Sequence, residues 1–178
     1  MTDKEGNVSF FNLASSRFSV RKYDGRHVKK NKLKKILEAG RIAPTAKNIQ
    51  PQKIYVIQSE EGIKKINDCC QCIYGAKTVL LVCYDKNIVW KNQFNPEITS
   101  GDVDCSIVLT HMMLEAQDQG VNSCWVAYFD HDLVSKTFEL PQNIVPVAIM
   151  PMGYGCEGVV PTPNHSNKKP LEEMIVNV

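Results

Sequence analysis

The chain has 178 residues, of which 43% are hydrophobic and 22% charged, as in an ordinary globular protein with one substantial core. A formal net charge of +2 argues against nucleic acid or a membrane surface as a partner. The start has no secretory-signal pattern, and no apolar run is long enough to span a bilayer. We therefore expect a single cytoplasmic domain over residues 1–178.

The first half of the chain predicts both helices and strands. Apolar residues that recur every three or four positions indicate a helix, and short apolar or β-branched runs indicate strands. The expected elements are a helix at 8–16, a helix that Asn31 caps and Pro44 ends, a strand at 53–59, a helix at 60–68 and a strand at 78–84.

The second half predicts the remaining elements of an α/β (α+β) protein. A polar, irregular stretch at 86–101 precedes a long helix at 102–120, a strand at 123–129, a helix at 130–138 and a strand at 145–153. The long helix is apolar over a wide arc, so it must be covered broadly, by its own core or by another subunit. Strands interspersed with helices imply a mixed central sheet flanked by helices.

The stretch "RFSVRKY" (17–23) indicates an anion site. In an extended segment Arg17, Ser19 and Arg21 project to the same side. Two guanidinium groups and a hydroxyl can donate to several oxygens of one anion, and arginine suits phosphate oxygens. The alternative is three solvated polar side chains on an exposed edge, because short motifs also match by chance.

A second stretch, "APTAKNIQPQ" (43–52), follows the lysine-rich helix. Prolines near both ends hold the backbone out of a helix, and Thr45, Asn48 and Gln50 offer hydroxyl and amide groups from a fixed loop. Such a loop could read the polar edge of a planar heterocycle. It could equally be a helix-stopping turn whose polar side chains lie in water.

Seven cysteines include the cluster "CCQC", which contains Cys69, Cys70 and Cys72. The cluster looks like a ligand set for iron and sulfur, but it lacks the usual ligand spacing. With no export signal, reduced thiols are the default. We therefore expect buried or incidental thiols and no bound metal.

The two motifs together resemble the FMN-dependent nitroreductase family: R-x-S-x-R, an intervening helix, then A-P-[ST]-x-x-N-x-Q-P before a strand. "HMMLEAQDQGVNSCWVAYF" is similar to the family's central helix and following strand, and "MGYG" with "NKKPLEEMI" is similar to its closing strand and basic tail. The resemblance covers nearly the whole chain. It implies a nitroreductase-like fold and a homodimer with two FMN groups at an interface formed by the long central helix.

The resemblance implies four groups of FMN-binding residues. The first group binds the phosphate, ribityl chain and nearby pyrimidine edge and consists of Arg17, Phe18, Ser19 and Arg21. The second group reaches the flavin of the other subunit and consists of Pro44, Thr45, Ala46, Asn48 and Gln50. The third group, which lies along the isoalloxazine ring, is Trp125, Val126 and Ala127, and the fourth, which returns from the tail to the phosphate, is Lys168 and Lys169.

The chain also departs from the family pattern. Phe18 stands where members often have a basic residue, and Gln52 where they often have an aromatic one. The tail offers lysines where an arginine is common, and "WVAYF" lacks the acidic residue and glycine that larger members place near the flavin's reactive nitrogen. These differences concern the substrate pocket more than FMN binding.

The implied activity is a ping-pong oxidoreductase. NADH or NADPH gives a hydride to FMN, and a nitroaromatic, quinone or similar small-molecule acceptor is then reduced. Arg21 is expected to stabilise negative charge on the pyrimidine end of the reduced ring, and no catalytic side chain is required. The alternatives are a flavin-binding carrier or sensor with little turnover and, more weakly, a nucleic-acid surface formed by lysines and arginines.

Overall fold

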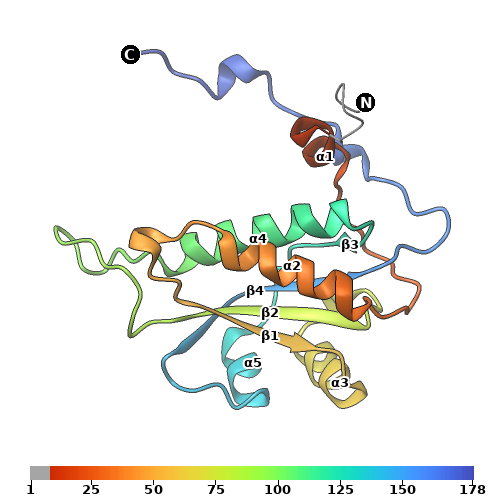
Figure 1. Cartoon of the computed structure of the whole chain (residues 1–178), viewed down its shortest axis with the longest axis horizontal. Helices are drawn as coiled ribbons and strands as arrows, with labels where there is room; N and C mark the ends of the chain where they lie inside the picture. Colours follow the sequence, from red (N-terminus) through yellow and green to blue (C-terminus); the bar gives the residue numbers. More distant parts are fainter. Residues whose placement is uncertain (1–8) are drawn as a thin grey trace.

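A central sheet of four strands organises the protein. The structure, a computed structural model, describes residues 9–178 (Figure 1). The strands are β1 (Gln52–Ile57), β2 (Thr78–Asp85), β3 (Asn122–Ser123) and β4 (Ile144–Gly153), in the order β1-β2-β4-β3 with every neighbouring pair antiparallel. The mixed α/β architecture expected from the sequence is confirmed, and the parallel component is a single bridge between Ser19 and Ser123.

Four helices cover the two faces of this sheet. One face carries α2 (Lys30–Ile42) and α4 (Gly101–Asp118), and the other carries α3 (Glu60–Cys69) and α5 (His131–Thr137) (Figure 1). The central strand β2 packs against both layers, because its side chains alternate: Leu81 belongs to the α3 and α5 side, and Leu80 to the α2 and α4 side. Both leucines are fully buried, as a continuous apolar strand predicts.

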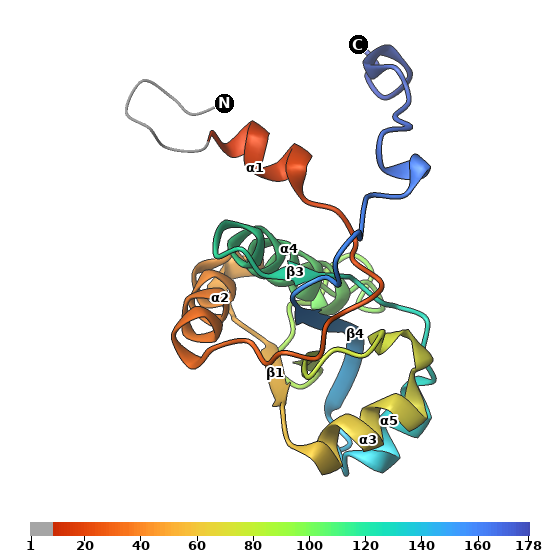
Figure 2. The same cartoon turned by 90° about the vertical axis from the view of Figure 1, so that its right-hand side faces the viewer.

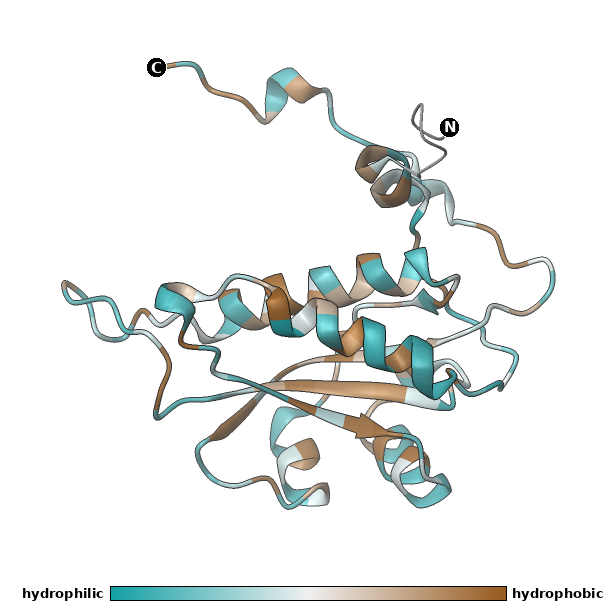
Figure 3. Ribbon diagram, in the orientation of Figure 1, coloured by the Kyte–Doolittle hydropathy of each residue, from teal (hydrophilic) through white to brown (hydrophobic). Residues whose placement is uncertain are grey.

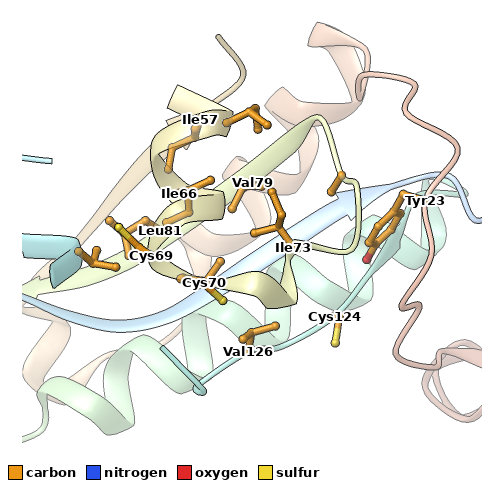
Figure 4. Packing of buried hydrophobic residues seen from close by; sticks show 14 of the residues in the cluster. Tyr23, Ile57, Ile66, Cys69, Cys70, Ile73, Val79, Leu81, Cys124 and Val126 are labelled. Atoms are coloured by element: carbon orange, nitrogen blue, oxygen red, sulfur yellow. The ribbon is translucent and has the colours of Figure 1, made fainter. Parts of the chain in front are cut away.

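Hydrophobic residues run through the strands and the sheet-facing sides of the helices (Figure 3). The cluster beneath α3 and α5 includes Ile66, Ile73, Val79 and Leu81 (Figure 4). On the opposite face α2 and α4 approach closely at Gly40, where an added Cβ would lie 2.8 Å from the Met112 Cγ. Glycine at this position therefore sets how near the two helices can come.

The strand expected at 123–129 is regular only as far as Ser123, which corrects that prediction. The register with β4 nevertheless continues, since Val126 and Ile149 exchange two 2.9 Å backbone hydrogen bonds. Between them the Cys124 N–H donates to the Pro151 carbonyl at 3.1 Å, but proline has no N–H to donate in return. One missing hydrogen bond thus interrupts the ladder, and the segment still follows β4.

The two ends of the chain lie away from the sheet. Helix α1 (Phe10–Ser16) and the tail with its short turns η3 (Pro163–His165) and η4 (Leu171–Glu173) project beyond the four-helix body (Figure 2). The helix predicted at 8–16 matches α1, although residue 8 lies outside the described residues. The second helix begins at Lys30 with Lys29 at the N-cap, so the Asn31 cap was wrong.

The first residue of β2 holds the segment just before α2, because the Val28 N–H donates to the buried Thr78 hydroxyl at 3.1 Å. That hydrogen bond fixes the chain just before the helix. Within residues 9–178, no helix is both long and apolar enough to cross a membrane.

Candidate functional site

The R-x-S-x-R stretch runs beside the segment that follows β3. The Val20 N–H donates to the Ser123 carbonyl at 3.2 Å, and Ser19 pairs with Ser123. Tyr23 anchors the end of the stretch, because its buried hydroxyl donates to the Pro151 carbonyl at 3.0 Å. The structure therefore brings the first and third groups of expected site residues, 17–21 and 125–127, to the same edge of the sheet.

The three polar side chains of the motif all affect the pKa of the Cys124 thiol. Burial raises the pKa of Cys124, while a hydrogen bond with Ser19 and the positive charges of Arg21 and Arg17 act to lower it. Ser19 thus contacts the Cys124 thiol, and the charges of Arg21 and Arg17 act on it (Cys124 is labelled in Figure 4).

Neither guanidinium of the motif is neutralised within residues 9–178. The ion pairs of this part of the chain are Arg26–Asp24, Arg41–Glu38 and Lys65–Glu61. Arg21 interacts instead with the Tyr74 hydroxyl, which lowers the Tyr74 pKa against the larger effect of burial. Beside the motif, the Ser123 hydroxyl is buried without a hydrogen-bond partner among the described residues. Two unneutralised cations and an unpaired hydroxyl form a site suited to an anionic, polar ligand.

A cavity of about 690 Å³ opens at the far end of the same segment. It lies between the C-terminal end of α3 and the residues just past Val126. Its lining residues are Asp68, Cys69, Cys70, Gln71, Cys72, Ala127, Tyr128, Phe129 and Asp130. The cysteine cluster and Ala127 therefore share one cavity, a proximity that residues more than fifty positions apart do not reveal in the sequence.

The loop from Pro44 to Gln50 is strained and held in place from α4. Lys47, Asn48 and Gln50 adopt φ values of 52°, 54° and 56°, a left-handed conformation that side chains with a Cβ rarely take. The Gln50 N–H donates to the Thr45 hydroxyl at 3.0 Å, which closes the loop. Strain of this kind persists only where the surroundings determine the conformation.

Asp104 is the anchor of that loop, and sequence reasoning missed it. Its side chain is 2% exposed, and its two oxygens accept from the Ala46 N–H at 2.9 Å and from the Ser100 hydroxyl at 2.7 Å. In the sequence Asp104 is indistinguishable from an ordinary carboxylate in the first turn of a helix. Only the packing of α4 against the loop gives it this role.

The loop does not meet the R-x-S-x-R stretch within one chain. The loop follows the C-terminal end of α2, whereas residues 17–28 precede its N-terminal end (Figure 1). Thirteen helical residues span about 20 Å, so the second group of expected site residues lies across the molecule from the first.

The tail, by contrast, passes close to the motif. The His165 Nε2 lies 3.2 Å from the Ser15 carbonyl oxygen, and its ring packs edge-on against Phe18 with centroids 6.1 Å apart. Lys168 and Lys169 follow this contact by three and four residues, and both are exposed. Phe18, where a basic residue was the commoner expectation, thus contacts the tail.

The comparisons with known proteins identify this fold. The model of the nitroreductase family matches residues 14–73 and 69–154. The chain belongs to the nitroreductase family. A crystal structure of a nitroreductase family protein from Clostridium difficile 630 is 41% identical, with a TM-score of 0.89 over 95% of this chain and 98% of that one.

Two further relatives show how far the likeness extends. A protein of Methanothermobacter thermautotrophicus, described provisionally as an NADH dehydrogenase/NAD(P)H nitroreductase, is 26% identical across 86% of this chain and 81% of its own. A protein of Exiguobacterium sibiricum, described provisionally as a nitroreductase, was crystallised in complex with FMN. It is 20% identical, with a TM-score of 0.82 over 96% of this chain and 98% of that one, and at this identity it bears on the fold alone.

The residues of this chain fit a flavin mononucleotide. The unneutralised Arg17 and Arg21 suit a phosphate and the electron-rich pyrimidine edge, and the Ser19 hydroxyl can donate between them. Trp125 is half-buried beside the motif and Ala127 is exposed at the cavity, so a planar ring could lie along this segment. Within residues 9–178, no group of three or more histidine, cysteine or acidic side chains is arranged to hold a metal ion.

Proposed function

We propose that the chain is an FMN-dependent oxidoreductase that uses NADH or NADPH to reduce nitroaromatics, quinones or similar small acceptors. The observation that carries this proposal is the pair of guanidinium groups, Arg17 and Arg21, that no carboxylate neutralises within residues 9–178 and that flank Ser19, which pairs with Ser123. Membership of the nitroreductase family and the names of its relatives support it.

The protein's part in the reaction is to bind and orient. Arg17 and the tail lysines hold the phosphate, and Ser19 donates to the ribityl chain or the pyrimidine edge. Bound FMN would supply the redox chemistry, namely hydride uptake from NADH or NADPH and two-electron reduction of the acceptor. Arg21 stabilises the negative charge that reduction leaves at the pyrimidine end, because a fixed cation acts most strongly where charge develops. No side chain is assigned as a general acid or base.

The second half of the site comes from another copy of the chain. The loop of Pro44, Thr45, Ala46, Asn48 and Gln50 lies across the molecule from Arg17, so it reaches a flavin only in a homodimer. The seven free cysteines support action in a reducing compartment such as the cytoplasm.

Exposed apolar surface supports the homodimer. Val103 on α4 is 59% exposed, and Phe10 and Phe11 on the projecting α1 are 71% and 78% exposed. A cavity of about 420 Å³ runs along the outer side of α4, lined by Asp102, Val103, Ser106, Ile107, Thr110 and His111. Large apolar side chains exposed in this number are typical of an association site. Met113, by contrast, is buried in the core of its own subunit and cannot face a partner.

The test compares two charge-removing variants. Arg17→Ala should weaken FMN binding about 10- to 100-fold, since a hydrogen bond to a charged group contributes about 1.5–3 kcal/mol. Lys22→Ala is the matched control: it removes the same charge from an exposed side chain next to Arg21 that is not among the proposed FMN-binding residues. Flavin fluorescence during titration measures both affinities. Equal affinities for the two variants would show that the phosphate assignment is wrong.

Turnover is tested on the wild-type protein loaded with FMN. NADH or NADPH, added without oxygen, should bleach the yellow absorbance, and a quinone or nitroaromatic should restore it. A yellow protein that neither reductant bleaches would instead be a flavin carrier or sensor. A protein that binds no FMN would contradict both functions.

A further inference from the structure

The cysteine cluster at the end of α3 has no part in the proposed flavin chemistry. Its three thiols nevertheless differ sharply in their surroundings. Cys69 is 8% exposed, and its thiol hydrogen-bonds the Thr137 hydroxyl at 3.4 Å, which ties it to α5. Cys70 is 3% exposed, whereas Cys72 is half-buried and is the most accessible of the three. All three line the cavity of about 690 Å³, which we call the thiol cavity.

Cys70 and Cys72 line the same cavity two positions apart and interact with one another. Burial raises the pKa of Cys70, and the next contributions to that pKa come from the backbone N–H and the thiol of Cys72. The Cys70 thiol also donates to the Tyr128 carbonyl at 3.6 Å, across the thiol cavity. In this arrangement, at a cavity wall, the more accessible thiol can be oxidised first. The buried thiol next to it can then form a disulfide with the oxidised sulfur.

The spacing of the two residues along the backbone is compatible with a disulfide in its Cα separation. The distance between Cα atoms two positions apart depends on the residue between them, here Gln71, which lies in the 3-10 turn η2 (Gln71–Ile73). Helical geometry sets that distance at about 5–5.5 Å, inside the range of about 4.4–6.8 Å that disulfides occupy. An adjacent pair such as Cys69 and Cys70 has no intervening residue to turn the chain.

We propose that Cys70 and Cys72 form an oxidation-sensitive pair, in which a hydroperoxide that enters the thiol cavity oxidises Cys72 and Cys70 then closes a disulfide. The Cys72 thiolate attacks one peroxide oxygen and the O–O bond breaks. The attacked oxygen becomes part of a sulfenic acid on Cys72, and the other oxygen leaves as an alcohol or as water. The Cys70 sulfur then attacks the sulfenic sulfur, a disulfide forms and water leaves. In total, two thiols lose two electrons and two protons, and the hydroperoxide is reduced to an alcohol and water. Ala127, which is proposed to lie along the flavin ring, also lines the thiol cavity, so the proposal is tested on the flavin-free protein.

Accessibility favours the first step at Cys72, because Cys69 and Cys70, the other two thiols that line the thiol cavity, are buried. The Cys72 thiol also interacts with the Tyr74 hydroxyl. Cys72 lies near enough to Cys124 to raise the Cys124 pKa, but Cys124 is 2% exposed and its thiol donates to the Trp125 carbonyl at 3.6 Å. Cys70 is therefore the expected second sulfur.

The test uses the full chain, reduced, desalted and treated with hydrogen peroxide or an alkyl hydroperoxide at one to five equivalents. After denaturation and alkylation, two of the seven thiols should have been lost. A tryptic peptide covering residues 66–77 contains Cys69, Cys70 and Cys72, so mass spectrometry locates the change. It should be two hydrogens lighter, with Cys69 alone alkylated. A disulfide through Cys124 or Cys69, a disulfide between two chains, or seven thiols retained would overturn the proposal.

Three serine variants separate the roles of the thiols. Cys72→Ser should slow thiol loss at least tenfold. Cys70→Ser should leave Cys72 as a sulfenic acid that reacts with dimedone. Cys69→Ser is the matched control and should form the disulfide at the wild-type rate, because serine keeps the hydrogen bond to Thr137. Thiol loss in Cys72→Ser at the wild-type rate would overturn the order of events. If Cys70→Ser fails to fold, the peptide map of the wild-type protein decides alone.

Discussion

Replacing Asp104 with alanine should loosen the loop that begins at Pro44 and destabilise the whole domain. The carboxylate accepts from the Ala46 N–H and the Ser100 hydroxyl, and hydrogen bonds to charged groups contribute about 1.5–3 kcal/mol each. Ala46 is half-buried, so water can replace part of that bond once the loop moves. We therefore expect a loss near the lower limit, about 3 kcal/mol, which for a domain of this size lowers the Tm by about 6–12 °C.

Two controls separate the anchor from a general helix effect. Asp104→Asn keeps a carbonyl oxygen for the Ala46 N–H and an amide that can donate to the Ser100 hydroxyl, so it should lose less than half as much. Asp102→Ala removes an exposed carboxylate from the same first turn of α4, where interaction with the helix dipole contributes about 0.3–1 kcal/mol.

Urea unfolding measures the free energy of each variant, and amide hydrogen exchange follows the Ala46 N–H directly. Exchange at Ala46 should accelerate in Asp104→Ala and stay protected in Asp102→Ala. If Asp104→Ala loses no more stability than Asp102→Ala, then the loop is held by other contacts and the anchor role is refuted.

Two further predictions concern association and pH. Val103→Glu places a charge on the exposed apolar side of α4, so light scattering should show that the proposed dimer dissociates. The control Leu133→Glu, on the opposite face of the sheet, should remain a dimer at the same concentrations. Equal behaviour of the two variants would rule out α4 as the interface. Burial raises the pKa of both Cys83 and Cys105 from 9.0 to about 12. Unfolded thiols ionise above pH 9.0 and folded ones only near pH 12, so each contributes stability that is present below pH 9.0 and lost across that window, by about 1.4 kcal/mol per pH unit. In Cys83→Ala the free energy of unfolding, measured with denaturant at several pH values, should fall less steeply above pH 9.0 than in the wild-type protein. An unchanged slope would show that the raised pKa of Cys83 does not contribute to stability.

The sequence by itself determined the elements and the family. The sequence located α2, α3 and α4 to within a few residues, and the unbroken apolar run at 78–84 identified β2 as the strand buried on both faces. The spacing of Arg17, Ser19 and Arg21 predicts that they share one side, because alternation along an extended segment is a local property of the backbone. Predictions from local sequence were less accurate where the structure of a segment depends on a neighbouring strand. The ladder beyond Ser123 is interrupted by Pro151, which belongs to another strand.

Only the tertiary structure decided which distant residues meet. Asp104 lies 58 residues from Ala46, and the cysteine cluster lies more than fifty from Ala127, yet each pair shares a contact or a cavity. Nothing in the composition or periodicity near Asp104 distinguishes a buried anchor from a solvated carboxylate, since the difference is the desolvation imposed by a loop folded over it. The same holds for Cys70 and Cys72: their spacing is local, but the burial of one and the access of the other come from the packing of α3 against the segment after Val126.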